Sequence, residues 1–248
     1  MSLAPVRSAQ RLPRRLLQLY VGLALYGASS AFLVRAGLGL DPWDVFHQGL
    51  AERTGWSIGT VSVAVGALVL LLWVPLRQRP GLGTVSNVFA VGLTMDATLA
   101  VLPDVHGAVA QAALLTAGIV LNGVATGLYI AARFGPGPRD GLMTGLHRRT
   151  GRSLRLVRTG IELTVLAAGV LLGGTAGVGT VAYALAIGPL SQLFLRVFAL
   201  PEEEALPEEG KAPAPARAGE AARAGEAAGA LEPAGAAAPA RAVDPARG

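Results

Sequence analysis

Two aspartates that could bind a cation or a proton occur in matching phrases of the sequence. Asp44 belongs to GLDPWDVFHQGLAERTGWS at residues 39–57, and Asp140 belongs to GPGPRDGLMTGLHRRTGRS at residues 135–153. Each aspartate follows a proline by two positions, which favours the first turn of a short helix. A carboxylate there can cap backbone N–H groups, or it can bind a cation or a proton inside a membrane. The two roles are compatible, and the sequence leaves both open.

Five further polar residues are candidates for binding a solute or an ion. Three lie inside apolar stretches and two lie where such stretches begin: Asn87, Asp96 and Gln192, then Thr84 and Thr180. Polar side chains are costly in lipid, so we expect the first three to face the interior of a helix bundle and to find partners there. The alternative is that such residues only join helices through hydrogen bonds, an interpretation that applies most directly to Asn122 and Asn87.

The two phrases are part of an internal duplication. Asp44 and Asp140 are 96 positions apart, and the same offset aligns the chain without a gap as far as Asp96 and Gln192. It also aligns GLGTV at 81–85 with GVGTV at 177–181. Duplications of this kind are typical of transporters with inverted repeats. We assign the repeated small residues and prolines a role in tight turns and close helix packing: Gly39, Pro42, Gly81, Gly83, Gly135, Pro138, Gly177 and Gly179.

No motif in the sequence indicates an enzyme or a metal centre. The chain has no cysteine, and its three histidines do not have the spacing of a metal cluster. Neither a nucleophile elbow nor His-Glu-x-x-His is present. We therefore expect no enzymatic activity, no metal and no cofactor. Glu162, four residues after Arg158, predicts a pair within one helix rather than a proton relay.

Hydropathy predicts the helices that position these residues. The expected fold is an all-α membrane protein with six transmembrane helices. The chain is 52% hydrophobic and 15% charged, with a mean hydropathy of +0.50, too apolar for an ordinary soluble domain. Six apolar runs come near the ~20 residues that cross a bilayer: 16–36, 58–76, 82–102, 108–132, 154–174 and 178–200. After Pro42 a segment of about 14 residues spans roughly 20 Å as a helix, too short to cross, so it is re-entrant or surface-lying.

Arginine placement predicts the orientation. Arginines precede the first run, follow the second and separate the fourth from the fifth, whereas the loops at 103–107 and 173–177 have none. The positive-inside rule then places both termini in the cytoplasm, and three spans per unit make the second unit inverted. Residues 1–15 form a basic cytoplasmic N-terminus, 16–102 repeat 1 and 103–200 repeat 2. The Ala/Pro/Gly/Glu/Arg composition of 201–248 predicts a disordered cytoplasmic tail. The net charge of +5 reflects this topology and not nucleic-acid binding.

Three stretches resemble the YczE/YyaS/YitT family of bacterial integral membrane proteins, closest to its YczE-like branch. They are GLGLDPWDVFHQGLAERTGWSIGTVSVAVG, PLRQRPGLGTVSN and GPGPRDGLMTGL. The similarity extends over nearly all of residues 16–198. It implies a multi-pass protein of the bacterial plasma membrane, and it carries no catalytic residues to this chain.

The leading functional prediction is a small-solute transporter or permease with its site at the interface of the two repeats. One alternative is a non-transporting membrane protein that assists or regulates a partner. Another is a channel in which the two short segments meet end to end. The partners expected are the lipid bilayer, a small solute or ion, and either a second copy of the chain or a partner membrane protein.

Overall fold

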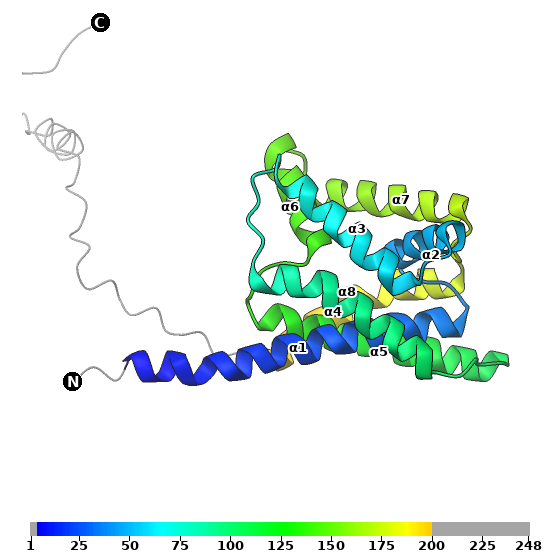
Figure 1. The fold of residues 1–248 in the computed structure, drawn as a ribbon, viewed down its shortest axis with the longest axis horizontal. Helices are drawn as coiled ribbons and strands as arrows, with labels where there is room; N and C mark the ends of the chain where they lie inside the picture. The colour runs from blue at the N-terminus through cyan, green and yellow to red at the C-terminus, as the bar shows by residue number, and fades with distance from the viewer. Residues whose placement is uncertain (1–3, 200–248) are drawn as a thin grey trace, which may run out of the picture. The chain divides into compact units, whose positions relative to one another are not determined.

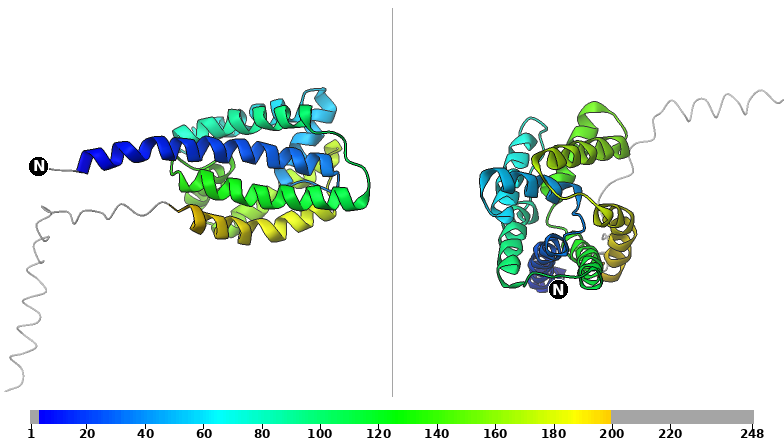
Figure 2. Two further views of the ribbon diagram at one scale, coloured as in Figure 1. Left: turned by 90° about the horizontal axis from the view of Figure 1, so that it is seen from below. Right: turned by 90° about the vertical axis from the view of Figure 1, so that its right-hand side faces the viewer.

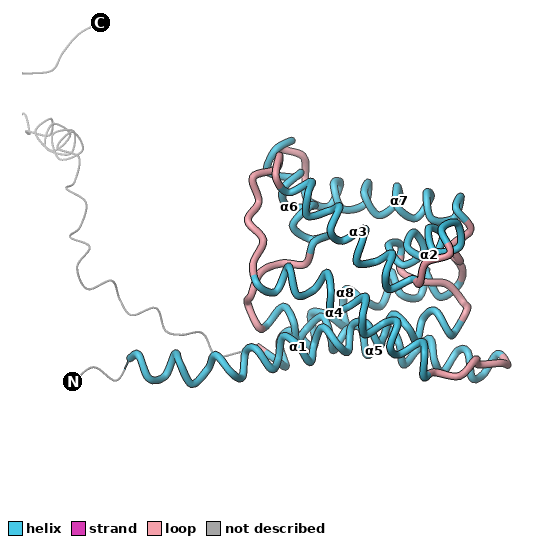
Figure 3. Tube along the Cα trace, viewed as in Figure 1, coloured by secondary structure: helices cyan, strands magenta, loops and turns pink. Residues whose placement is uncertain are grey.

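The computed structural model describes residues 4–199, with side-chain surroundings from residue 12 onward. The predicted disordered tail at 201–248 lies outside the described residues. This part of the chain contains only helices, joined by loops (Figures 1 and 3). The helices are α1 Ala4–Ala36, α2 Pro42–Thr54, α3 Ile58–Trp73, α4 Leu82–Val101, α5 Ala108–Ala131, α6 Pro138–Thr150, α7 Leu154–Leu172 and α8 Val178–Phe198.

Four helices form one layer of the described unit. The helices α4, α1, α5 and α8 lie side by side in that order, and the other four cover one face of the layer (Figures 1 and 2). Within the layer, α1 and α4 run in one direction and α5 and α8 in the opposite direction (Figure 2). The layer therefore contains one pair of parallel helices from each half of the duplication.

The same four helices are the ones long and apolar enough to cross a membrane. Within the described residues they are the candidate spans Leu12–Ala36, Leu82–Val101, Ala108–Ala131 and Val178–Phe198. A fifth candidate is the pair α2 and α3, taken as one span bent by 113°. The helix α3 has only 16 residues, and α7 carries Arg155, Arg158 and Glu162. The six-span count stays a prediction.

The duplication reappears in the local structure. Under the 96-residue offset, α2 and α6 have the same first and last positions, and α3 and α4 start where α7 and α8 start. Gly55 and Gly151 end the two short helices with φ of 73° and 68°, a left-handed conformation that glycine adopts without strain. Ser57 and Ser153 then cap the helices that follow. These ends repeat because they depend on residues close in sequence.

In each repeat, the Gly-x-Gly-Thr sequence at the start of the last helix contacts the other repeat where its Gly/Pro/Asp segment begins. The Gly83 N–H donates to the Phe134 carbonyl at 2.9 Å, and the equivalent Gly179 N–H donates to the Leu38 carbonyl at 2.8 Å. A methyl group added at Gly39 would lie 2.6 Å from the Gly177 nitrogen. The glycines thus permit backbone contact between segments that are far apart in the chain.

The two halves are not equally tight. A methyl group added at Gly49 of α2 would lie 2.6 Å from the Gly169 carbonyl oxygen of α7, whereas at the equivalent Gly145 of α6 the nearest atoms are side-chain atoms of Gln78 and Leu76 at 3.1 Å. The helix α3 also packs along α4, while the equivalent α7 and α8 are not among the helix pairs in extended contact. The contacts of α2 with α7 and of α3 with α4 are therefore closer than the equivalent contacts in the other half of the duplication.

Candidate functional site

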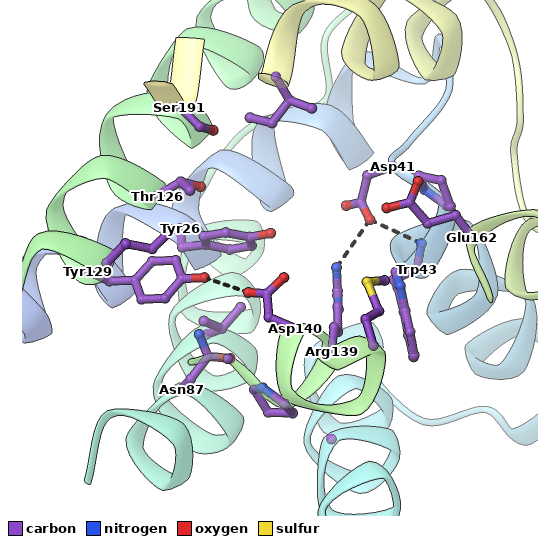
Figure 4. A pocket seen from close by; sticks show the side chains of 18 of the residues that line it. Tyr26, Asp41, Trp43, Asn87, Thr126, Tyr129, Arg139, Asp140, Glu162 and Ser191 are labelled. Atoms are coloured by element: carbon purple, nitrogen blue, oxygen red, sulfur yellow. Dashed lines mark hydrogen bonds and ion pairs between the residues drawn. The ribbon is translucent and has the colours of Figure 1, made fainter. Parts of the chain in front are cut away.

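A cavity of about 560 Å³ lies where the two halves of the duplication meet (Figure 4). Each of the eight described helices contributes to its lining, from Tyr26 of α1 to Tyr183 of α8. The first turns of both short helices, α2 and α6, reach it. Its volume is in the range of small-molecule binding sites, which is about 300–1,000 Å³.

Arg139, in the first turn of α6, connects the two repeats inside this cavity. Its guanidinium nitrogens lie 3.3 Å from Asp41 Oδ1 and 3.5 Å from Asp44 Oδ1. Its guanidinium carbon lies 5.1 Å from the centre of the Trp43 ring, a cation–π arrangement. Trp43 and Arg139 occupy equivalent positions of the duplication. The pseudo-symmetric positions therefore hold complementary side chains that contact each other.

Neither Asp44 nor Asp140 is the N-cap residue of its helix, although both lie in the first turn. Asp41 is the N-cap of α2 and its Oδ1 accepts from the Trp43 N–H at 3.0 Å, whereas the N-cap of α6 is Gly137, which has no side chain to accept such a bond. The aspartates stand three positions later, where a side chain points inward. Asp44 lies 3.1 Å from His47 Nδ1 as well as near Arg139, and Asp140 accepts from the Tyr129 hydroxyl at 3.1 Å.

The carboxylates outnumber the cations at the centre of the site. Asp41 and Asp44 are 2% and 1% exposed, and the Oδ2 atom of each has no hydrogen-bond partner within the described structure. Asp41 lies in the connection between α1 and α2, outside the candidate spans. Burial and the neighbouring Asp44 carboxylate raise the pKa of Asp41 above its ordinary value, although Arg139 lowers it. The site therefore has an excess of negative charge, which an added cation or a proton would neutralise.

Three of the predicted polar candidates border the cavity: Asn87, Asp140 and Gln192. The prolines Pro42 and Pro138 border it too. Asp44 is in contact with the cavity residues Arg139 and His47, and it is itself almost fully enclosed.

The other candidates lie away from the cavity, at helix ends. Asp96 accepts from the Gly59 N–H at 2.9 Å and from the Ser57 hydroxyl at 2.6 Å, so it holds the start of α3. Thr84 donates to the Pro136 carbonyl at 2.7 Å, and Thr180 accepts from the Gly177 N–H at 3.2 Å. Each of these three side chains forms a hydrogen bond at the start of a helix.

Two predictions about polar residues can be compared with the structure. The Arg158–Glu162 pair is confirmed at 2.9 Å, and both residues border the cavity from α7. Asn122 donates to the Ser29 hydroxyl at 2.8 Å and accepts from the Tyr183 hydroxyl at 3.0 Å. This buried network joins α1, α5 and α8, which is the interhelical role expected of a polar residue in a span.

Sequence reasoning missed the cation at the centre of the site. Arg139 counted as one of the cytoplasmic loop arginines, but only a quarter of its side chain is exposed. Asp41 received no role, although an aspartate directly before a proline fits the N-cap and N1 positions of a helix. The signal that could have revealed Arg139 is its equivalence to Trp43 under the offset. Within the described residues, no group of three or more His, Cys, Asp or Glu could hold a metal ion.

Comparison with known proteins places the chain in a family. The model of DUF6198, described as a family of unknown function, matches residues 13–196. The chain belongs to this family. It is similar to a protein of Haemophilus influenzae described as uncharacterized, with 38% identity over 73% of this chain and 83% of the relative. It is also similar to the Bacillus subtilis membrane protein YczE, with 36% identity over 66% and 75% of the two chains.

A third relative extends the resemblance. The YyaS protein of Bacillus subtilis is 23% identical over 71% of this chain and 90% of its own length. The expected resemblance to YczE and YyaS is therefore confirmed. No solved structure matches the chain. Together with the apolar helices, the membrane-protein relative identifies a multi-pass integral membrane protein.

Proposed function

We propose that this protein is a small-solute transporter of the bacterial plasma membrane, not an enzyme, and that the cavity is its binding site. The observation that carries the proposal is the position of Arg139 and its carboxylate partners. They join the short helices of the two repeats inside a cavity that every described helix lines. Transporters built from repeats place their sites at such an interface, where short or interrupted helices end.

The proposed topology is two inverted repeats of three spans each, with both termini in the cytoplasm. The opposite directions of α1 and α4 against α5 and α8 support it (Figure 2). So do the reciprocal hydrogen bonds from Gly83 and Gly179. In this topology α3 and α7 complete the six spans, and α2 and α6 enter the membrane from opposite faces. Their polar ends meet inside protein, where irregular backbone at membrane depth is tolerated.

The unequal packing of the two halves favours a transporter over a channel. The short helix α2 is pressed against α7 through Gly49 and Gly169. The equivalent helix α6 meets only side-chain atoms at Gly145, and α7 has no extended contact with α8. A transporter opens its site to one side of the membrane at a time, and the two halves then differ in each state. A channel formed by two half-helices meeting end to end has no such need. We infer that the structure corresponds to one of the two access states.

Uptake into proteoliposomes tests the proposal. Wild-type protein should accumulate at least one member of a broad panel of radiolabelled solutes. Gly188 borders the cavity on α8, and no atom lies within 4 Å of a methyl group added there. Gly188→Trp should therefore place an indole at the wall of the cavity and lower uptake. Gly160 of α7 is equally unobstructed but does not border the cavity, so Gly160→Trp is the matched control and should retain uptake.

Two results would contradict the transporter. Absence of uptake by correctly inserted wild-type protein across the panel would favour the regulatory alternative. Equal uptake by Gly188→Trp and Gly160→Trp would show that the solute does not pass through this cavity.

A further inference from the structure

We propose that the ligand of the cavity is a small organic cation, an amine or guanidinium compound, held between the carboxylates of Asp41 and Asp140. This inference rests on the proposed function and specifies its substrate class. Figure 4 shows both carboxyl groups and the Tyr26 hydroxyl directed into the same space. The two aspartates come from different repeats, so a bound cation would connect α2 and α6.

The first argument is the charge in the site. Asp41, Asp44 and Asp140 are three carboxylates, and Arg139 is the guanidinium that contacts the first two. The other cavity arginine, Arg158, is already paired with Glu162. Buried carboxylates are stable only when they are paired or protonated. The site therefore has room for additional positive charge and repels an anion.

The second argument is an unsatisfied acceptor. Asp41 is 98% buried and borders the cavity, and its Oδ2 atom has no hydrogen-bond partner in the described part of the chain. Its other oxygen is used by the Trp43 N–H and by Arg139. This oxygen is enclosed, so a donor from a ligand reaches it once the Asp41 side chain turns toward the cavity, and the hydrogen bond then removes the cost of an unpaired buried acceptor. An ammonium or guanidinium group supplies such donors.

The third argument is the aromatic lining, which separates an organic cation from a metal ion. Trp43 already stacks with the Arg139 guanidinium, and Tyr26, Tyr129 and Tyr183 border the same cavity. Aromatic faces attract alkylated cations, and metal ions prefer several oxygen or nitrogen ligands. The described residues contain no group of metal ligands, and a volume of about 560 Å³ far exceeds that of a single ion.

Binding to purified protein in nanodiscs tests the ligand class without requiring transport. The probes are agmatine, putrescine and choline, with glucose and succinate as neutral and anionic controls, and calorimetry and thermal unfolding are the readouts. We expect at least one organic cation to bind and to raise the melting temperature, and the two controls to do neither. Asp41→Asn and Asp140→Asn should each weaken cation binding by at least about tenfold, because a buried charge partner is removed.

The matched control is Asp104→Asn. Asp104 is a surface carboxylate whose side chain is 71% exposed and which pairs with Arg35, outside the cavity. This variant should bind cations as the wild type does. Asp41 and Asp140 lie on different elements, so either one still tests the proposal if the other variant fails to fold.

The outcomes separate the ligand class from the transport function. Uptake of neutral or anionic solutes without cation binding would overturn the inference and leave the transporter intact. Cation binding without uptake of that cation would support the site and overturn the transporter. Binding of sodium ions alone, or cation binding that Asp41→Asn and Asp140→Asn leave unchanged, would also overturn the inference.

Discussion

The substitution Gly39→Ala tests the contact by which the two repeats hold each other. Gly39 has φ of +118°, and an added methyl group would lie 2.6 Å from the Gly177 nitrogen and 2.7 Å from Thr180 Oγ1. Gly173 has φ of +109°, and its added methyl group would meet no atom within 4 Å. Both substitutions strain the backbone to a similar degree, because alanine rarely adopts φ values this far outside the left-handed region. Only the first forces two segments of the fold apart.

The difference between the two variants isolates the contact. Strain at positive φ and the effect of alanine on the unfolded chain are common to both, so they largely cancel. Overpacking typically costs about 1–3 kcal/mol. We therefore expect Gly39→Ala to lower the free energy of unfolding by about 1–3 kcal/mol more than Gly173→Ala does. Unfolding in mixed micelles with increasing SDS, followed by tryptophan fluorescence, measures this difference.

The duplication supplies an independent repetition of the experiment. Gly135 has φ of +111°, and its added methyl group would lie 2.9 Å from Thr84 Oγ1. Gly135→Ala should therefore also destabilise the protein by more than Gly173→Ala does. Equal destabilisation within both pairs would refute the reciprocal packing of the repeats.

Three further predictions follow from the buried polar groups and the proposed topology. Asn122→Ala should destabilise the bundle by about 1–2 kcal/mol and Tyr183→Phe by about 0.6 kcal/mol, since the second removes only one interhelical hydrogen bond; equal effects in SDS unfolding would contradict the network. Arg139→Ala should destabilise the protein by about 3–5 kcal/mol by leaving buried carboxylates unpaired, and added methylguanidine should raise the melting temperature of this variant by more than it raises that of wild type; an equal effect on both would show that the vacated space does not accept a cation. Cysteines replacing Val105 and Arg148 in this cysteine-free chain should be labelled from the outside and from the cytoplasm respectively, and labelling of both from one side would exclude the inverted topology.

The sequence alone predicts the helices and their repetition well, because helix ends depend on nearby residues. The helix α2 begins at Pro42 and is ended by Gly55. At the equivalent positions, α6 begins at Pro138 and is ended by Gly151. Proline fits the first turn of a helix, and glycine adopts the left-handed conformation that ends one. The pair Arg158 and Glu162 was also predictable, since four residues separate neighbours on one helix face.

The composition of the site depends on contacts between residues far apart in the chain, which local signals do not contain. Asp96 lies in a predicted span and Asp140 in a predicted short segment between spans, and the structure shows that the first holds the start of α3 while the second faces the cavity. A count of arginines along the chain places Arg139 in a cytoplasmic loop. Only the tertiary fold, which brings the first turn of α6 close to the start of α2, provides Asp41 and Asp44 as its partners, and a buried guanidinium is stable only where such partners are already in place.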